Sequence, residues 1–423
     1  MPGSLTKTLI LLALAALLAS VPAASQEELK DDRKIEKYRD SSETMTESVY
    51  RRLGKIQEDI AAENYGEAVA ALKRLSNSSL NDYEEALVLQ TYGYAYIQQS
   101  QFKLAVDYFE KSLAMESLPG EAQQGMLYSL ASLYASEGRY QQAIDTMRTW
   151  FRYEAKPIAD AYMVIASSFV ELQRFDDALP YVQKAIRVAE KPREQWYMLE
   201  LAIYFEKQRF RNAVSLLRKM VQYWPDNGKY WDMLASAYLE LDQDKNALDT
   251  MMVAYANGLI EDKSRLMAVV QLNLALNIPF TAGMILEKEM AAGRIEDSKK
   301  NLELLLQAWI SAMEYARAVK TIDRLGPLAN DGEYFMRKAG IHNQLGEWSQ
   351  VIVAIKQALD KGLEDAADAH MLAGMAYAEL EQFDAALTAF RNARSTGDEK
   401  QRRNATAWID FVQEKIGLKN AAL

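Results

Sequence analysis

Residues 229–256 read KYWDMLASAYLELDQDKNALDTMMVAYA, and this stretch decides the fold. Large and small apolar side chains recur in it three and four residues apart, the spacing of one helix face. The residues with this spacing are Trp231, Leu234, Ala235 and Tyr238 and, after a polar stretch, Ala247, Met251 and Ala254. The stretch therefore predicts two consecutive helices joined by a short turn.

A small residue recurs at the position of Ala247 along most of the chain. Successive occurrences lie 33 to 38 residues apart. They are Ala68, Ala105, Ala143, Ala178, Ala213, Ala247, Ala282, Ala318, Val351 and Ala386. A period of this size is typical of helical arrays in which each unit stacks only on its neighbours.

Nine residues before this position, from the second unit onward, a large side chain recurs. The residues are Tyr96, Tyr134, Phe169, Tyr204, Tyr238, Asn273, Trp309, His342 and Tyr377, and seven of these nine are aromatic. The distance between units varies, whereas this gap does not. We therefore expect rigid helix–turn–helix hairpins with variable connections, in which the small residue lets the two helices approach closely.

The best units resemble the signature of the tetratricopeptide repeat (TPR). They are Trp231-x-x-Leu234-Ala235-x-x-Tyr238 with Ala247, Gly374-x-x-Tyr377 with Ala386, and Gly93-x-x-Tyr96 with Ala105. The resemblance implies an all-α TPR solenoid, a right-handed superhelix of about ten repeats over residues 44–394, with a C-terminal capping helix in residues 395–423. The first unit, which lacks its aromatic residue, and the unit with Asn273 and Pro279 match least, so we expect Ala282→Leu to be tolerated better than Ala213→Leu or Ala247→Leu.

The first 25 residues have the layout of a secretory signal peptide. Lys7 precedes the apolar run TLILLALAALLAS (8–20), and small residues follow in VPAAS (21–25). We predict cleavage near Gln26 and a periplasmic mature protein; a retained membrane anchor is the alternative. Residues 26–43 form a charged lead-in that we expect to be solvated.

Composition excludes several classes of function. Lys and Arg total 49 against 59 Asp and Glu, and a net charge of -10 is the wrong sign for nucleic-acid binding. The chain has no cysteine, which removes disulfides, thiolate catalysis and zinc–cysteine sites. We expect no nucleic-acid partner.

The sequence contains no recognisable catalytic or metal-binding constellation. His342 and His370 occupy ordinary repeat positions without a second ligand at metal spacing. The stretch Asp242-x-Asp244-x-Asn246 begins like a calcium loop but continues with Ala247 where the turn needs glycine. We therefore predict that the chain is not an enzyme and has no cofactor, metal or small-molecule substrate.

One repeat position favours a peptide-binding groove on the first helices, which line the concave face of TPR arrays. Methionine is adaptable and recurs on surfaces that bind irregular peptides. Six residues before the aromatic slot lie Tyr128, Met163, Met198, Met267, Met336 and Met371, and two residues after it lie Glu171, Glu206, Glu240 and Glu379. These residues predict a groove for an extended basic or apolar segment. Packing between hairpins is the alternative explanation of the methionines.

Five stretches carry a narrower resemblance, to the periplasmic TPR proteins that accompany TonB–ExbB–ExbD energy-transduction systems. They are VYRRLGKIQE (49–58), LNDYEEAL (80–87), KYWDMLASAYLEL (229–241), NLELLLQAW (301–309) and AGMAYAELEQFDAALTAF (373–390). The resemblance implies a protein-binding scaffold of TonB-dependent outer-membrane uptake, with periplasmic parts of TonB or ExbD as partners at the inner-membrane complex. The alternative is a TPR adaptor of another envelope-assembly or polysaccharide-export machine.

Overall fold

The computed structural model describes residues 29–30, 34–38 and 44–422, with side chains to residue 417. This part of the chain contains 21 α-helices, one 3-10 turn and no strand, so the predicted all-α class is confirmed. The predicted signal peptide, residues 1–25, lies outside the described residues. The chain divides into two compact units, Met1–Tyr223 and Trp224–Leu423.

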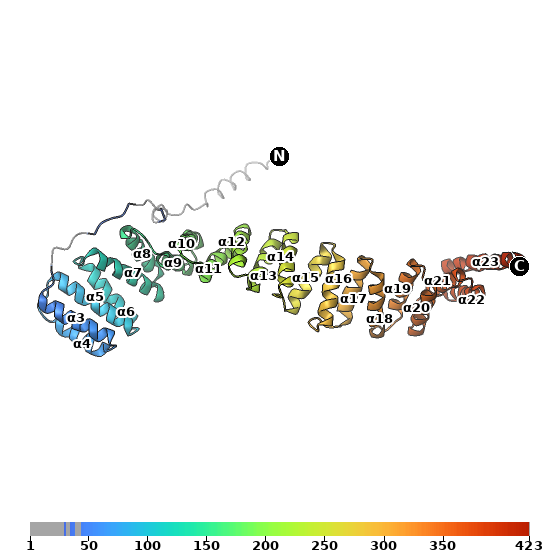
Figure 1. Cartoon of the computed structure of the whole chain (residues 1–423), viewed down its shortest axis with the longest axis horizontal. Coiled ribbons are helices and arrows are strands. Elements are labelled where there is room, and N and C mark those ends of the chain that lie inside the picture. The colour runs from blue at the N-terminus through green and yellow to red at the C-terminus, as the bar shows by residue number, and fades with distance from the viewer. Residues whose placement is uncertain (1–28, 31–33, 39–43, 423) are drawn as a thin grey trace, which may run out of the picture. The chain divides into compact units, whose positions relative to one another are not determined.

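The first unit contains five helical hairpins, each stacked on the next (Figure 1). Their helices are α3 (Glu47–Ala61), α4 (Tyr65–Ser76), α5 (Asp82–Gln98), α6 (Phe102–Ala114), α7 (Gly120–Ser136), α8 (Tyr140–Tyr153), α9 (Ala159–Glu171), α10 (Phe175–Val188), α11 (Glu194–Glu206) and α12 (Phe210–Tyr223).

The second unit contains five more hairpins and a final helix. Its elements are α13 (Gly228–Leu239), α14 (Asp244–Ala256), α15 (Lys263–Ala275), α16 (Pro279–Ala291), α17 (Lys299–Ser311), α18 (Tyr315–Leu325), the 3-10 turn η1 (Gly326–Leu328), α19 (Glu333–Gln344), α20 (Trp348–Lys361), α21 (Ala366–Glu379), α22 (Phe383–Thr396) and α23 (Glu399–Ala422). The last helix packs on α22, where a C-terminal cap is expected.

The recurring small residue is fully buried in all ten hairpins, from Ala68 to Ala386. Ala282 also has 0% exposure, so its burial gives no reason for a leucine there to be tolerated better than at Ala247. Its neighbour Gly283 lies under the ring of Trp309, and a Cβ atom there would come within 2.6 Å of that ring. In the aromatic slot of the same hairpin, the buried Asn273 amide donates a 2.8 Å hydrogen bond to the Val269 carbonyl oxygen.

The turn inside each hairpin has one backbone geometry, which explains the constant gap of nine residues. Four residues after the aromatic slot the backbone is left-handed, as at Gln173 (φ 57°), Asp242 (φ 55°) and Gly138 (φ 76°). The next amide closes the turn on the carbonyl oxygen of the slot residue, as from Arg174 to Phe169 at 2.8 Å. This bond is the long one of the Schellman motif, which ends the first helix at a fixed residue.

Buried polar contacts join neighbouring hairpins. The Glu289 side chain on α16 is fully buried and accepts a 2.6 Å hydrogen bond from the Tyr255 hydroxyl on α14. Arg294 donates to the other carboxylate oxygen. This hydrogen bond from Arg294 is the main cause that lowers the pKa of Glu289, against the opposing effect of burial.

The charged side chains of the described lead-in, Lys30, Lys34, Glu36 and Lys37, are exposed, whereas two of its other residues contact the first unit. Leu29 packs against the buried cluster of α8, α9 and α10. The ring of Tyr38 stacks on that of Tyr153 with 3.9 Å between centroids. The described part of the lead-in therefore contacts the first unit through Leu29 and Tyr38.

We predict that Ala247→Leu and Ala282→Leu each lower the free energy of unfolding by about 1–3 kcal/mol, because both overpack a helix crossing. The control Ala70→Leu changes an exposed residue of α4 and should have an effect below about 0.5 kcal/mol. Chemical denaturation measures all three. Equal losses in the control and the buried variants would contradict the proposed crossing.

We also predict a pH-dependent effect of Glu289→Gln. The folded-state pKa of Glu289 is lowered, so its ionised form stabilises the fold above the unfolded pKa of about 4.3. This contribution is lost as the pH falls through the folded pKa. The variant should therefore unfold at lower urea concentration than the wild type at pH 7, with a difference that shrinks toward pH 3. A difference that grows on acidification would contradict this assignment.

Candidate functional site

The six predicted groove residues six positions before the aromatic slot all lie on first helices. Tyr128, Met163 and Met198 lie on α7, α9 and α11 of the first unit. Met267, Met336 and Met371 lie on α15, α19 and α21 of the second unit. Each unit therefore carries its own short row, and the residues form two sets of three.

These side chains combine packing with exposure. Tyr128 and Met163 are half-buried against the apolar cluster of α8, α9 and α10. Met267, Met336 and Met371 are likewise half-buried, each against the cluster beneath it. Met198 is 37% exposed. The methionines thus contribute to the core and also present part of their surface to solvent.

The four predicted glutamates lie at the hairpin turns. Glu171, Glu206 and Glu379 are the last residues of α9, α11 and α21, and Glu240 follows the last residue of α13. Each lies eight residues after the groove position of its hairpin, about 12 Å along the helix axis. The glutamates therefore stand at one end of the first helices and do not flank the methionines.

The position of these glutamates is unfavourable for helix stability. All four are exposed. A negative charge at a helix C-terminus opposes the helix dipole by roughly 0.3–1 kcal/mol. Desolvation raises the pKa of Tyr140 on α8, and the interaction of its hydroxyl with Glu171 raises it further. All four glutamates nevertheless keep exposed charge at the same place in their hairpins.

Tyr94 on α5 extends the row of the first unit, and the pattern of methionines did not identify it. Its side chain is 37% exposed, and its ring meets Phe109 edge-on with 5.0 Å between centroids. Burial of the rest of the phenol raises its pKa, whereas hydrogen bonds with Ser129 and Gln90 oppose that rise. Tyr94, Tyr128, Met163 and Met198 give the first unit a row of uncharged side chains on four successive first helices, which we call the first-helix row.

The second unit interrupts its row with charged residues that contact neighbouring hairpins. Asp232 on α13 forms a 2.6 Å ion pair with Arg265 on α15. Glu303 on α17 accepts a hydrogen bond from the Tyr334 hydroxyl on α19. Both carboxylates occupy the methionine position of their hairpins, and both are engaged within the fold. The first-helix row is therefore the better candidate surface.

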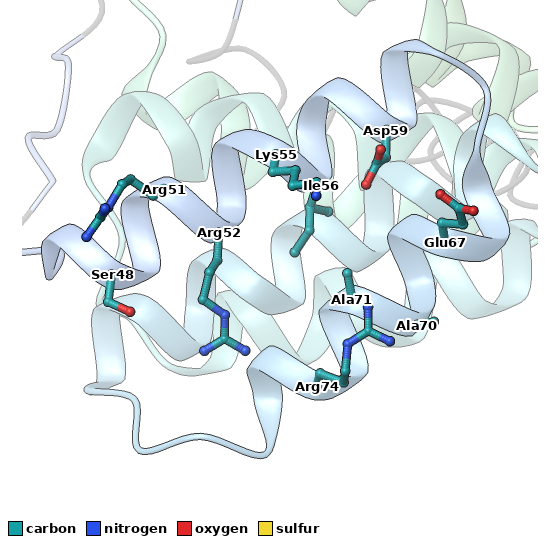
Figure 2. A pocket seen from close by; sticks show the side chains of 10 residues that line it. All are labelled: Ser48, Arg51, Arg52, Lys55, Ile56, Asp59, Glu67, Ala70, Ala71 and Arg74. Carbon is teal, nitrogen blue, oxygen red and sulfur yellow. The ribbon is translucent and has the colours of Figure 1, made fainter.

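A groove on the first hairpin lies between α3 and α4 (Figure 2). It has a volume of about 710 Å³, and its apolar lining residues are Ile56, Ala70 and Ala71. Basic residues dominate one end, with Arg51 exposed, whereas Asp59 lies at the other end.

A capping role explains the charges in this groove. Arg52, Lys55 and Asp59 stand 16, 13 and 9 residues before Ala68. The same three positions before Ala247 hold the apolar signature residues Trp231, Leu234 and Tyr238. The outer face of a first repeat has no preceding hairpin to cover it, and terminal repeats in such arrays have polar outer faces.

Both histidines have structural surroundings. His342 is 8% exposed, and its Nδ1 atom lies 2.6 Å from the Glu347 carboxylate. His370 lines a groove of about 380 Å³ between α20 and α22, and burial lowers its pKa. Among the described residues, no group of three or more His, Cys, Asp or Glu side chains could hold a metal ion. No described helix is long and apolar enough to cross a membrane.

Comparisons with known proteins identify the repeat. The family model of the tetratricopeptide repeat matches residues 91–157, 128–197 and 342–400. No match to a curated protein was found. The matched ranges exclude the first hairpin and residues 198–341, which contain both the hairpin with Asn273 and the stretch 229–256.

Three solved structures are similar in part to this chain. The TPR protein YrrB, described with an unusual peptide-binding site, is 16% identical with a TM-score of 0.34 over 39% of this chain and 82% of its own. The structure of Naa15/Naa10 bound to HypK-THB is 13% identical with a TM-score of 0.41, and the match covers 84% of this chain and 59% of that one. The TPR2AB domain of yeast Sti1 in complex with pHSP90 is 16% identical with a TM-score of 0.30, and the match covers 60% of this chain and 98% of that one.

The family match and the hairpin geometry together confirm a TPR solenoid. Ten hairpins share one small position, one turn geometry and one stacking mode. TPR solenoids are protein–protein interaction scaffolds that present extended surfaces. The right-handed superhelical twist stays a prediction.

We predict different stability effects at two methionines of the first-helix row. Met163→Ala should lower the free energy of unfolding by about 1–2 kcal/mol, because this side chain packs on the cluster beneath it. Met198→Ala should change it by less than about 1 kcal/mol, since its side chain is more exposed. Chemical denaturation distinguishes the two. A larger loss at Met198 would place that residue in the core and remove it from the binding surface.

Proposed function

We propose that this tetratricopeptide-repeat protein is an exported scaffold that binds an extended segment of a partner protein along the first-helix row. We further propose that the partner belongs to a TonB-type energy-transduction system in the periplasm. One observation carries the first proposal: Tyr94, Tyr128, Met163 and Met198 present uncharged, partly exposed side chains on four successive hairpins.

The chemistry of this surface specifies an apolar and basic ligand. Methionine and tyrosine side chains adapt to irregular apolar groups. Glu171 and Glu206 add exposed negative charge at one end of the same helices. A segment rich in proline and lysine has this character, because proline keeps it extended and lysine supplies complementary charge.

The partner system is supported by the sequence resemblance to TPR proteins of TonB–ExbB–ExbD systems. Two of the stretches behind that resemblance form joints inside the fold. In LNDYE, the Asn81 and Glu84 side chains cap the start of α5, and Glu84 also accepts hydrogen bonds from the backbone amide and hydroxyl of Thr46. In NLELL, Glu303 binds Tyr334 of the next hairpin. These two stretches therefore contribute to contacts within the fold. The residues proposed to bind the partner, those of the first-helix row, lie outside both stretches.

We predict that a synthetic Pro/Lys-rich peptide binds the full chain and that two pairs of substitutions act differently. Met163→Ala with Met198→Ala removes apolar contact area and should weaken binding by about tenfold. Glu171→Gln with Glu206→Gln removes only charge, so it should slow association and flatten the salt dependence. Titrations at low and high salt measure both effects.

The matched control is Leu104→Ala, which changes a side chain that is 39% exposed on α6, a second helix of the same unit. Binding should be unchanged in this variant. Equal affinity of the methionine variant and the wild type, with both folded, would move the partner to another surface.

A further inference from the structure

The described residues of the N-terminal lead-in lie along an edge of the first unit. The edge is formed by the start of α7 and the ends of α8 and α10. Leu29 packs against the buried cluster that contains Phe151 and Tyr181. The contacts there show how this edge recognises a polypeptide.

Two contacts at the edge recognise the polypeptide backbone. The Glu36 amide donates a 2.9 Å hydrogen bond to the Arg152 carbonyl oxygen, in the last turn of α8, where carbonyl groups have no partner within the helix. The Lys184 side chain on α10 is 5% exposed, and its Nζ atom donates a 3.2 Å hydrogen bond to the Leu29 carbonyl oxygen. A buried ammonium group needs acceptors of this kind, so the backbone carbonyl meets a requirement of the fold.

A further contact recognises an aromatic side chain. The Tyr38 ring stacks on Tyr153 with an interplanar angle of 15°. Its hydroxyl donates a 2.7 Å hydrogen bond to Gln124 Oε1, and Gln124 is oriented by its own 2.9 Å bond to the Trp150 carbonyl oxygen. A Cβ atom on Gly120 would lie 2.6 Å from the Tyr38 ring, so the absence of a side chain at Gly120 makes room for the ring.

We propose that this edge is a binding site for an extended polypeptide and that residues 29–30 and 34–38 of the chain itself occupy it. The site accepts an apolar residue at the position of Leu29, an aromatic residue nine positions later, and backbone groups between them. A short connection to α3 gives these residues a high effective concentration at the edge, which keeps other polypeptides out. The inference uses other residues than the first-helix row, although Leu29 packs on the same cluster as Tyr128 and Met163.

The test uses a fluorescent peptide with the sequence of residues 26–43, QEELKDDRKIEKYRDSSE, added to the full-length protein. The wild-type chain should bind it only at background level, because the site is filled. The variant L29A with Y38A should release the edge and bind the peptide saturably, at least tenfold more tightly than the wild type. Tyr50→Ala is the matched control, since Tyr50 is 67% exposed on α3 and lies outside the edge.

Gly120→Ala, added to the variant L29A with Y38A, should abolish peptide binding because its Cβ atom fills the space of the tyrosine ring. Alanine is a better helix former than glycine, so α7 should remain folded, which circular dichroism checks. In an otherwise wild-type chain, Gly120→Ala should speed hydrogen exchange at the Glu36 amide. The proposal would be overturned if the variant L29A with Y38A failed to bind the peptide, or if the Tyr50→Ala control bound it as tightly as that variant. Unchanged hydrogen exchange at the Glu36 amide in the Gly120→Ala protein would also overturn it.

Discussion

The close approach of the two helices inside each hairpin is the constraint on which the structure depends. It requires a small residue on the second helix, and all ten such residues are fully buried. The left-handed residue of the turn and its closing hydrogen bond hold the aromatic slot nine residues upstream. The helix crossing and the gap of nine residues are therefore constant, and the length of the chain varies only in the connections between hairpins. Ion pairs such as Arg193–Asp160 join neighbouring hairpins across these connections.

The sequence was sufficient to predict the hairpins because their packing is set by local spacing. It predicted all ten small positions, including the one that holds Val351. It underestimated the hairpin with Asn273, because a buried amide that bonds its own helix can replace an aromatic ring in the slot. Repeat signatures weigh the type of residue, whereas the fold responds to volume and to satisfied hydrogen bonds.

The candidate surface was less predictable, because the same repeat position serves packing in one hairpin and exposure in another. Met198 presents more of its surface than Met163, the other methionine of the first-helix row. Asp232 occupies the equivalent position and forms an ion pair with the next hairpin. The contact of Tyr38 with Gln124 could not be inferred from repeat spacing, because the two residues are 86 positions apart in the chain. Such contacts arise from the stacking of hairpins, which sequence periodicity does not specify in detail.

The central claim is that the partner segment lies along the first helices of the first unit. The most direct measurement is photo-cross-linking in cells, with a photoreactive amino acid in place of Met198 on α11 or of Leu104 on α6, both partly exposed. The account predicts cross-links from position 198 to an extended segment of a TonB- or ExbD-type protein, identified by mass spectrometry, and none from position 104. Cross-links to that protein from position 104 and none from position 198 would contradict it.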